Sequence, residues 1–250
     1  MGAVGEIFSS VQGEGLYVGR RQIFVRFYGC PLRCIYCDTK EFWTPKSSCR
    51  VEISPGSGRF RKVGPLDVEG VVKEVLRLKT ADVHSISLTG GEPLASPDFL
   101  TKLVKRLREK GLRTYLETAG TDPKVAREIS DFLDFACVDL KLPDHGAVPA
   151  TRWGDLLESE LASIRILKEK GVEVFGKMVL LETSSIRTFS KVCRRFSELG
   201  VPLVLQPVTP TGGVRPPSPS QLLRMSTLAS SAGVKEVRII PQMHRLMGIR

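Results

Sequence analysis

The sequence predicts an α/β fold arranged as an incomplete (β/α)6 barrel, and two features support this. Apolar runs rich in β-branched and aromatic residues alternate with amphipathic helical stretches from residue 22 onward, which indicates βαβ units around a parallel sheet. Six such units are fewer than the eight of a closed barrel, so we expect a curved, open sheet. Functional side chains should then gather at the carboxyl ends of the strands.

Each element is expected from its own hydrophobic period and its start signals. Strands are predicted at residues 22–27, 84–88, 112–117, 135–140, 172–180 and 202–206, with a last run at 236–240. Helices are predicted at residues 68–78, 98–110, 123–132, 153–170, 186–199 and 218–232, several of them opened by Ser, Asp or Pro.

Two segments do not follow the alternation. Residues 41–66 contain Pro, Gly and Ser with short β-like pieces, and we interpret them as an insertion near the cysteine motif described below. Residues 5–15 precede the first barrel strand and predict a small extra strand and a loop. The chain has no internal repeat or low-complexity tract, so we interpret residues 1–250 as a single domain.

The composition bounds the class of partner. The chain has 37 Lys and Arg residues against 27 Asp and Glu residues, a net charge of +10. A charge of this sign is typical of proteins that bind nucleic acid. The basic residues sit on helices such as 102–110, where they form a solvated outer face, so nucleic acid is disfavoured and anionic small molecules are favoured. The sequence has no apolar run long enough for a membrane span and no signal pattern, and we expect a cytoplasmic protein.

Three cysteines, Cys30, Cys34 and Cys37, form a C-x3-C-x2-C run directly after the first barrel strand. A structural zinc ion takes four ligands, and a simple electron-transfer 4Fe-4S cluster takes four cysteines. A trio therefore favours a 4Fe-4S cluster with one iron open to a small molecule. The alternative is a zinc site completed by a distant histidine or by Cys49. Cys137 and Cys193 have no spacing that would indicate a second site.

A second motif, Thr-Gly-Gly-Glu-Pro at residues 89–93, follows the strand predicted at 84–88. Two adjacent glycines at a strand end remove both side chains where a ligand could lie against the backbone. The carbonyls that this exposes can accept hydrogen bonds from an ammonium group. Alone, the Gly-Gly-Glu-Pro tetrapeptide at 90–93 would be an ordinary turn before a helix.

Together, the two motifs resemble the radical S-adenosylmethionine (SAM) superfamily, in which SAM chelates the open iron of the cluster. Further segments resemble the 7-carboxy-7-deazaguanine synthase family within it. They are Gln-Gly-Glu-Gly at 12–15, Phe-Val-Arg-Phe at 24–27, Leu-Glu-Thr-Ala-Gly-Thr at 116–121, Leu-Gln-Pro at 205–207 and Pro-Gln-x-His-Arg-x-x-Gly at 241–248. These motifs extend over most of the chain in one order, which makes the resemblance specific.

The resemblance implies a reaction and its cofactors. The family converts 6-carboxy-5,6,7,8-tetrahydropterin to 7-carboxy-7-deazaguanine on the route to queuosine and archaeosine. A 5'-deoxyadenosyl radical formed from SAM removes hydrogen from C6, ring contraction and ammonia loss follow, and SAM is regenerated. A 4Fe-4S cluster, SAM and Mg2+ are the implied cofactors. The implied partners are an electron donor such as flavodoxin or ferredoxin and a second copy of the chain in a homodimer.

The resemblance also implies roles for individual residues. Cys30, Cys34 and Cys37 would hold the cluster, and the Thr39 hydroxyl would bind Mg2+, a cation that prefers oxygen. The substrate would contact Gln12, Glu14, Arg26, Thr89, Gln206, His244 and Arg250. SAM would contact Gly90, Gly91, Glu92, Glu117, Thr118, Asp139 and Lys141.

Several of these residues have plainer alternatives. Gln12 and Glu14 could form a solvated Gly-rich turn, and Arg26, expected to pair with the substrate carboxylate, could be a surface arginine. Asp38 is expected to cap the following helix. The chain also departs from the commoner family pattern at residues 139–143 and at Ala119, so the residues around the SAM ribose are less well defined.

The C-terminal segment 241–250 is expected to dock at the barrel mouth, with Met243, Leu246, Met247 and Ile249 buried beneath it. Two other functions remain as alternatives. A glycyl-radical enzyme activase has the same cysteine spacing but lacks the Gln-Gly-Glu-Gly run and the histidine-containing tail. A non-enzymatic metal-binding nucleic-acid module is favoured only by the net charge.

Overall fold

The computed structural model describes residues 2–249, and within them ten strands form one sheet in the order β10-β9-β8-β7-β6-β5-β2-β1-β3-β4. Seven neighbouring strands are parallel. They are β2 (Arg21–Phe27), β5 (Ser85–Gly90), β6 (Thr114–Thr118), β7 (Phe135–Asp139), β8 (Glu173–Leu180), β9 (Leu203–Pro207) and β10 (Val237–Ile239). Because β10 and β4 form the two edges and do not pair, the barrel is open, as the sequence predicts.

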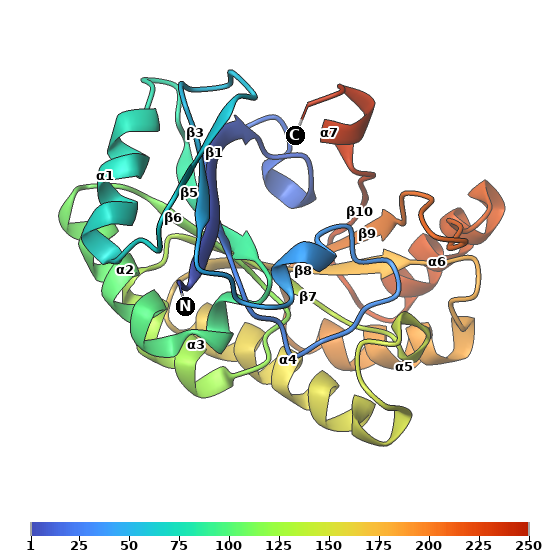
Figure 1. Ribbon diagram of the computed structural model, residues 1–250. Helices are drawn as coiled ribbons and strands as arrows, with labels where there is room; N and C mark the ends of the chain where they lie inside the picture. Colours follow the sequence, from blue (N-terminus) through green and yellow to red (C-terminus); the bar gives the residue numbers. More distant parts are fainter. Residues whose placement is uncertain (1, 250) are drawn as a thin grey trace.

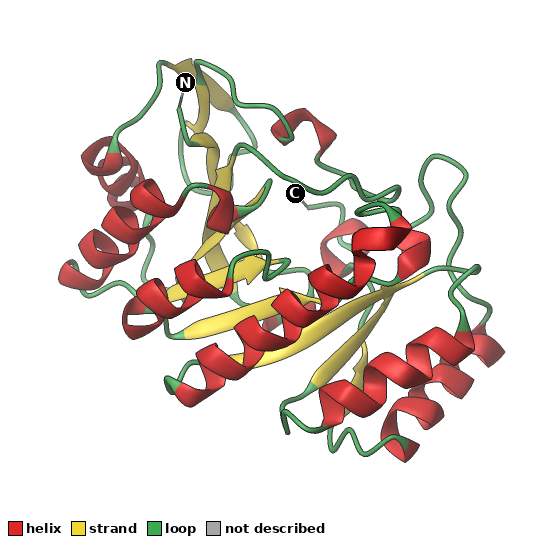
Figure 2. Ribbon diagram, turned by 90° about the horizontal axis from the view of Figure 1, so that it is seen from below, coloured by secondary structure: helices red, strands yellow, loops and turns green. Residues whose placement is uncertain are grey.

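Helices connect the parallel strands and cover the outer side of the curved sheet (Figures 1 and 2). They are α1 (Val68–Leu78), α2 (Pro97–Glu109), α3 (Pro123–Ile129), α4 (Trp153–Glu169), α5 (Ile186–Ser197) and α6 (Pro219–Ser231), and the short α7 (Met243–Leu246) ends the chain. Single 3-10 turns are η1 (Gly15–Tyr17), η2 (Lys40–Phe42), η3 (Pro93–Ala95), η4 (Ser130–Phe132), η5 (Pro143–His145) and η6 (Ala150–Arg152). All six predicted barrel helices are confirmed, with ends that differ by at most three residues.

Helix α1 illustrates why these residues form helices. The Asp67 side chain caps its first turn by accepting a hydrogen bond from the Gly70 backbone N–H at 2.8 Å, which satisfies a donor that the helix itself leaves free. Val71, Val75 and Leu78 recur at helical spacing and are fully buried against the sheet. The main core lies in this layer between the helices and the outer face of the strands.

The N-terminal segment forms a longer strand than the sequence predicts. Strand β1 (Val4–Val11) runs antiparallel to β2 over its whole length and is almost entirely buried. The chain then turns through η1, and the Tyr17 ring packs on Tyr115, Phe135 and Phe175 near the amino ends of β6, β7 and β8. These aromatic rings close the floor of the barrel, so a ligand has access only from the opposite end.

Residues 41–66, predicted as one insertion near the cysteine motif, have two different roles. Phe42 and Trp43 accept backbone hydrogen bonds from Gly29 and Cys30, so the start of the segment lies against the cysteine loop. The remainder forms a hairpin of β3 (Cys49–Glu52) and β4 (Phe60–Val63) that extends the sheet beyond β1. The hairpin thus lies at the sheet edge, because β3 pairs with β1.

No helix between residues 2 and 249 combines the length and the apolar character needed to cross a bilayer.

Candidate active site

A cavity of about 350 Å³ opens at the carboxyl ends of the parallel strands, opposite the aromatic floor. It collects almost every residue that the sequence predicts for the site. Those that line it are Gln12, Glu14, Arg26, Cys30, Cys34, Cys37, Thr39, Thr89, Gly90, Gly91, Glu92, Glu117, Thr118, Asp139, Lys141, Gln206 and His244. Arg250 lies outside the described residues. The volume lies within the range of small-molecule sites.

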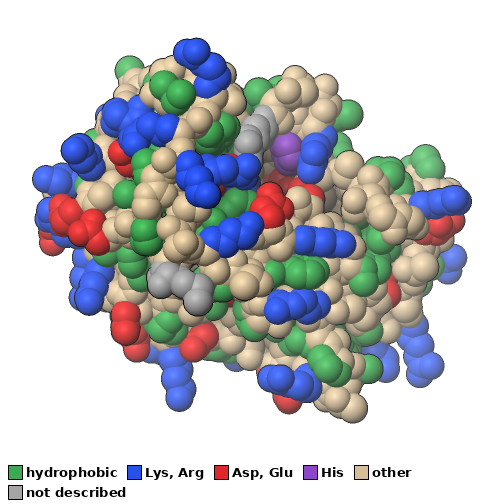
Figure 3. Space-filling view, in the orientation of Figure 1, with side chains coloured by type: hydrophobic (Ala, Val, Ile, Leu, Met, Phe, Trp, Pro, Cys, Tyr) green, Lys and Arg blue, Asp and Glu red, His purple; other side chains and the backbone are tan. Residues whose placement is uncertain are grey.

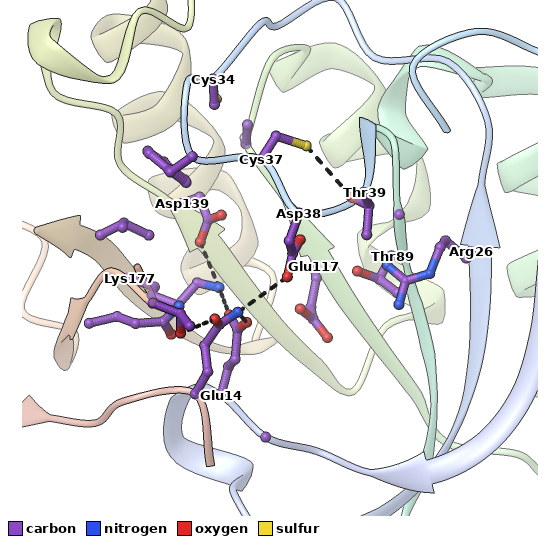
Figure 4. Close-up of a pocket in the computed structure, with 18 of the residues that line it drawn as sticks. Glu14, Arg26, Cys34, Cys37, Asp38, Thr39, Thr89, Glu117, Asp139 and Lys177 are labelled. Atoms are coloured by element: carbon purple, nitrogen blue, oxygen red, sulfur yellow. Dashed lines mark hydrogen bonds and ion pairs between the residues drawn. The ribbon is translucent and has the colours of Figure 1, made fainter. Parts of the chain in front are cut away.

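The cysteine loop follows β2 and is held in place by the segment after β7. The backbone N–H of Arg33 donates to the Ala147 carbonyl at 3.0 Å, and that of Ile35 donates to the His145 carbonyl at 2.9 Å. All six cysteines of the chain are free thiols. Cys30 and Cys37 are half-buried at the cavity wall, and Cys34 is buried. Figure 4 shows Cys34 and Cys37. Burial raises the pKa of Cys30 to about 11 and also raises that of Cys34.

Within residues 2–249, no three His, Cys, Asp or Glu side chains lie close enough to share a single metal ion. The three thiolates of a 4Fe-4S cluster each bind a different iron and need not lie that close. The three thiols of this loop line one cavity and pack with a small apolar cluster that includes Leu32 and Ala119, and this arrangement fits such a 4Fe-4S cluster.

The two glycines of the second motif are required by packing within the protein. A Cβ atom on Gly90, whose φ is +109°, would lie 2.4 Å from Cγ of Arg26, and one on Gly91 would lie 2.3 Å from the carbonyl oxygen of Gly29. Backbone hydrogen bonds from Gly91 to Phe27 and from Glu92 to Gly29 continue the β2–β5 pairing beyond the strand ends. The sequence suggests that the glycines make room for a ligand. In the structure they make room for Arg26 and Gly29, so that the loop after β5 can pack against the end of β2 and the loop after it.

The Glu92 and Thr118 side chains are directed at each other. The Glu92 carboxylate accepts hydrogen bonds from the Thr118 hydroxyl, from the Ala119 N–H at 2.7 Å and from the Leu94 N–H at 3.1 Å. Burial raises the pKa of Glu92, although these hydrogen bonds oppose the shift. Both side chains are thus engaged within the protein, where they join the ends of β5 and β6 and shape the cavity wall.

A chain of buried charges crosses the cavity. Lys177 on β8 forms ion pairs with Glu14 and, at 3.2 Å, with Asp139 on β7 (Figure 4). Asp139 also pairs with Lys141 at 3.0 Å, and the Lys141 ammonium donates to the Tyr36 hydroxyl at 3.3 Å. Two buried lysines thus balance two half-buried carboxylates at the cavity wall.

This balance keeps the four groups charged. Burial alone would raise the pKa of Glu14, but Lys177 and the Gln242 amide outweigh it and lower the value to about 2. Burial likewise opposes ionisation of Asp139, and Lys141 followed by Lys177 lowers its pKa. For Lys177 the penalty of burial is overcome mainly by Asp139 and then by Glu14, so its pKa is raised well above the usual value.

Glu117 differs from these acids, because burial raises its pKa. Its Oε1 atom accepts hydrogen bonds from Nε2 of Gln12 at 2.8 Å and from the Ser87 hydroxyl at 2.9 Å. Gln12 in turn accepts the Glu14 backbone N–H at 3.0 Å. Gln12, which the sequence assigns to the substrate, and Glu117, which it assigns to SAM, therefore form one hydrogen-bonded unit.

Arg26 and Thr89 lie side by side on β2 and β5, where the parallel register pairs them (Figure 4). The Arg26 side chain is 18% exposed, and its Nε atom lies 3.5 Å from Oε2 of Glu6. Its guanidinium lies 5.5 Å from the ring centres of both Phe8 and Phe42. Arg26 is thus a cation fixed at the cavity wall by an acid and two rings.

Thr39 and Asp38 follow the last cysteine of the motif. The Thr39 hydroxyl lies 3.7 Å from the Cys37 sulfur at the cavity wall. The expectation that Asp38 caps the next helix is wrong, because its carboxylate accepts hydrogen bonds from Arg245 at 3.2 Å and from Gln242 at 3.5 Å. Asp38 instead connects the cysteine loop to the C-terminal tail.

The tail reaches the cavity through its polar residues. The Met243 N–H donates to the Gly13 carbonyl at 2.8 Å, and the Gln242 amide donates to Glu14 at 2.6 Å. The apolar residues expected to be buried behave differently: Met243 is half-buried, Leu246 is 73% exposed, and Met247 and Ile249 are also exposed. Hydrogen bonds rather than apolar burial therefore hold residues 242–245.

Comparison with known proteins shows to which protein family the chain belongs. Residues 24–196 match the family model "Radical SAM superfamily". The chain is 42% identical over 213 residues to the 7-carboxy-7-deazaguanine synthase of Thermococcus kodakarensis, covering 82% of this chain and 83% of the relative. It is 40% identical to the synthase of Methanothermobacter thermautotrophicus over 261 residues, 98% of this chain and 96% of the relative. The chain belongs to the 7-carboxy-7-deazaguanine synthase family.

A solved structure, QueE from Escherichia coli, shares the fold with a TM-score of 0.60 and 19% identity, covering 96% of this chain and 93% of that one. Membership of the synthase family makes the protein a radical SAM enzyme of 7-deazapurine biosynthesis and implies a 4Fe-4S cluster and SAM. The cysteine loop and the residue 89–93 segment supply a thiol trio and backbone carbonyls on adjacent walls of one cavity, which fits both groups.

Sequence reasoning missed four residues that organise this synthase-family site: Tyr36, His145, Lys177 and Gln242. Lys177 could have been found from the sequence, because it is the one charged residue within the otherwise uncharged run 174–181. A lysine buried in a strand that lines a barrel interior needs an acidic partner. The partner itself could not be inferred, because Glu14 lies 163 residues away in the chain.

Proposed function

We propose that the protein converts 6-carboxy-5,6,7,8-tetrahydropterin to 7-carboxy-7-deazaguanine. The observation that carries this proposal is the layout of the single cavity described above. The three thiols, the Gly90–Gly91 backbone and the polar unit of Gln12, Glu14 and Glu117 all line this cavity. When bound, the cluster and SAM supply a 5'-deoxyadenosyl radical that takes hydrogen from C6 of the pterin.

The polar unit fits the guanidine-like edge of a pterin. Glu14 is held ionised, and both hydrogen bonds that Glu117 accepts, from Gln12 and from Ser87, are made by its Oε1 atom. Carboxylate oxygens accept hydrogen bonds from the N–H groups of such an edge. Gln206 adds a further acceptor: it is only 3% exposed, lines the cavity, and its Oε1 atom has no partner within residues 2–249.

A positive charge, that of Arg26, would recognise the carboxylate end of the substrate. Arg26 lies at the cavity wall beside Thr89, and its guanidinium can bind the substrate carboxylate while the Thr89 hydroxyl contacts the ring. His244, from the docked tail, closes this side of the cavity next to Gly13. These assignments place the substrate between the N-terminal segment, β2 and the tail.

On the cluster side, the residue 90–91 backbone would accept hydrogen bonds from the SAM amino group, with Glu92 and Thr118 acting as positioning residues behind it. Asp139 and Lys141 would contact the remainder of SAM. We place Glu117 with Gln12 at the substrate. Thr39 would offer its hydroxyl to Mg2+ between the two ligands.

The remaining proposals concern the setting of the enzyme. A small electron carrier such as flavodoxin or ferredoxin would reduce the cluster, and a homodimer would be the functional form. The cytoplasm, which keeps thiols reduced, suits the six free cysteines. Residues 1–250 would act as one radical SAM domain with residues 41–66 as its insertion.

Anaerobic incubation of the reconstituted enzyme with carboxytetrahydropterin, SAM and dithionite tests the proposal. We expect 7-carboxy-7-deazaguanine by mass spectrometry, release of one ammonia per turnover, and SAM that is not consumed. Substrate deuterated at C6 should transfer deuterium into SAM. Production of 5'-deoxyadenosine without any deazapurine would reject the pterin as substrate and direct attention to a protein substrate, as for an activase.

A further inference from the structure

The outer side of the cysteine loop is a surface that the proposed reaction does not use. Side chains alternate along it: Leu32 and Cys34 are buried, whereas Pro31, Arg33 and Ile35 are exposed, and Ile35 is 46% exposed. Figure 3 shows Lys and Arg side chains gathered across the middle of the face on which Figure 1 draws this loop. The same loop carries Cys30, Cys34 and Cys37, which line the cavity.

Two cations are fixed on this surface by one aromatic ring. The Arg33 guanidinium lies 5.0 Å and the Lys40 ammonium 5.9 Å from the centre of the Trp43 ring. Arg33 also donates to the carbonyls of Cys30 at 2.6 Å and Leu32 at 2.8 Å, which places its charge directly over the first cysteine. Neither cation forms an ion pair with a carboxylate within residues 2–249.

The acidic groups nearby cancel only part of this charge. Asp38 is paired with Arg245 of the tail and lines the cavity. Glu41, next to Lys40, is exposed and brings one negative charge to this surface. Arg33 and Lys40 therefore leave an excess of positive charge beside the exposed apolar side chains of Ile35 and Pro31, in a chain whose net charge is +10.

We propose that this surface, formed by Pro31, Arg33, Ile35 and Lys40, docks a small acidic protein that delivers single electrons. The proposal rests on the proposed function, which requires one electron to leave the carrier and enter the cluster, so that the carrier is oxidised and the cluster reduced by one electron. Complementary charge steers such encounters, and redox complexes bury little area, as a patch of this size would. The inner side of the loop is needed for SAM and substrate, so the carrier has access from the outer side.

Binding is measured on the reconstituted holoenzyme with oxidised flavodoxin as the probe, by calorimetry at low and high salt. Lys40→Glu, Ile35→Ser and the double variant Arg33→Glu with Lys40→Glu are compared with the wild type. Lys73→Glu on α1, an exposed lysine of the outer helical layer, is the control with the same change in charge. Iron content is measured for each protein, because Arg33 also holds the loop backbone.

We expect Lys40→Glu to weaken flavodoxin binding about tenfold, the double variant to weaken it further, and the salt dependence of binding to shrink in both. Ile35→Ser should weaken binding without changing the salt dependence, and Lys73→Glu should bind as the wild type does. Reduction of the cluster by reduced flavodoxin, followed by loss of visible absorbance, should slow in parallel, while reduction by dithionite stays unchanged.

Equal losses in Lys40→Glu and Lys73→Glu would show that net charge alone attracts the carrier and would overturn the docking surface. Wild-type binding by all the variants, or no binding by the wild type, would overturn it as well. Failure of the proposed function is distinguishable, because it would appear as absent deazapurine formation with dithionite, whereas the docking surface is judged from binding and from the rate of cluster reduction.

Discussion

The ammonium of Lys177 forms an ion pair with the carboxylate of Glu14, 163 residues earlier in the chain. The Lys177 side chain is 6% exposed, and its second partner, Asp139, lies 3.2 Å away. One buried cation thus joins the loop after β1 to two barrel strands and fixes a wall of the cavity.

Replacing Lys177 tests how much this buried cation contributes to the stability of the fold. Lys177→Met leaves the half-buried carboxylates of Glu14 and Asp139 without the buried cation that they share. We expect a loss of about 3 kcal/mol in the free energy of unfolding, at the lower end for a broken buried pair, because Asp139 keeps Lys141 as a partner. Urea denaturation measures it. Lys170→Met, which removes an exposed pair with Asp131, should cost less than about 1 kcal/mol. Similar losses in the two variants would show that Lys177 is not a buried anchor.

The cluster assignment predicts that Cys30→Ala, Cys34→Ala and Cys37→Ala each abolish 4Fe-4S binding, because two thiolates are too few to hold it. Iron and sulfide analysis after anaerobic reconstitution measures this. Cys49→Ala, Cys137→Ala and Cys193→Ala are matched controls and should retain the wild-type iron content. A normal cluster in any of the first three variants would exclude that cysteine as a ligand.

The magnesium assignment predicts that turnover rises with added Mg2+ and that Thr39→Ala weakens this response. Reductive cleavage of SAM should be little changed, because the hydroxyl is not a cluster ligand. Thr39→Ser, which keeps the hydroxyl, is the control and should respond to Mg2+ as the wild type does. If Thr39→Ala is stimulated to the same extent, the ion does not bind at Thr39.

The contact between Gly13 and the tail predicts a steric effect on substrate binding. A Cβ atom on Gly13 would lie 2.0 Å from Nδ1 of His244, so Gly13→Ala should displace the tail. We expect KM for the pterin to rise about tenfold, with iron content unchanged, as expected for lost binding contacts. Gly64→Ala, whose Cβ would meet no atom within 4 Å, is the control. An unchanged KM would show that the tail does not bound the substrate site.

Burial lowers the pKa of His145 to about 3, with Lys141 adding to the effect. The unfolded chain binds a proton near pH 6.5 and the folded protein does not, so this histidine makes stability fall as pH decreases from about 6.5 toward 3. We expect a slope of about 1.4 kcal/mol per pH unit from this group. His145→Gln should flatten the pH dependence of urea denaturation between pH 6 and 5. An identical slope in the variant would assign the dependence to other groups.

Local patterns were sufficient for much of the fold and the site. The alternation of apolar runs and amphipathic stretches predicted the parallel strands and all six barrel helices, because each period reports which face of an element is buried. The order of the strands then places every strand-end motif at the same mouth. The resemblance to the synthase family assigned the cysteine trio, Gln12, Glu117 and Gln206 to one site, and all of them line the same cavity.

The tertiary structure decided how those residues are used. The pairing of Lys177 with Glu14, of Gln12 with Glu117 and of Asp38 with Arg245 depends on contacts between segments more than 100 residues apart, and no local period reports such contacts. The same limit applies to the hairpin of residues 49–63, whose position at the sheet edge follows from its pairing with β1. Sequence patterns therefore determined which residues face the cavity, and the packing of distant segments determined which of them remain available to a ligand.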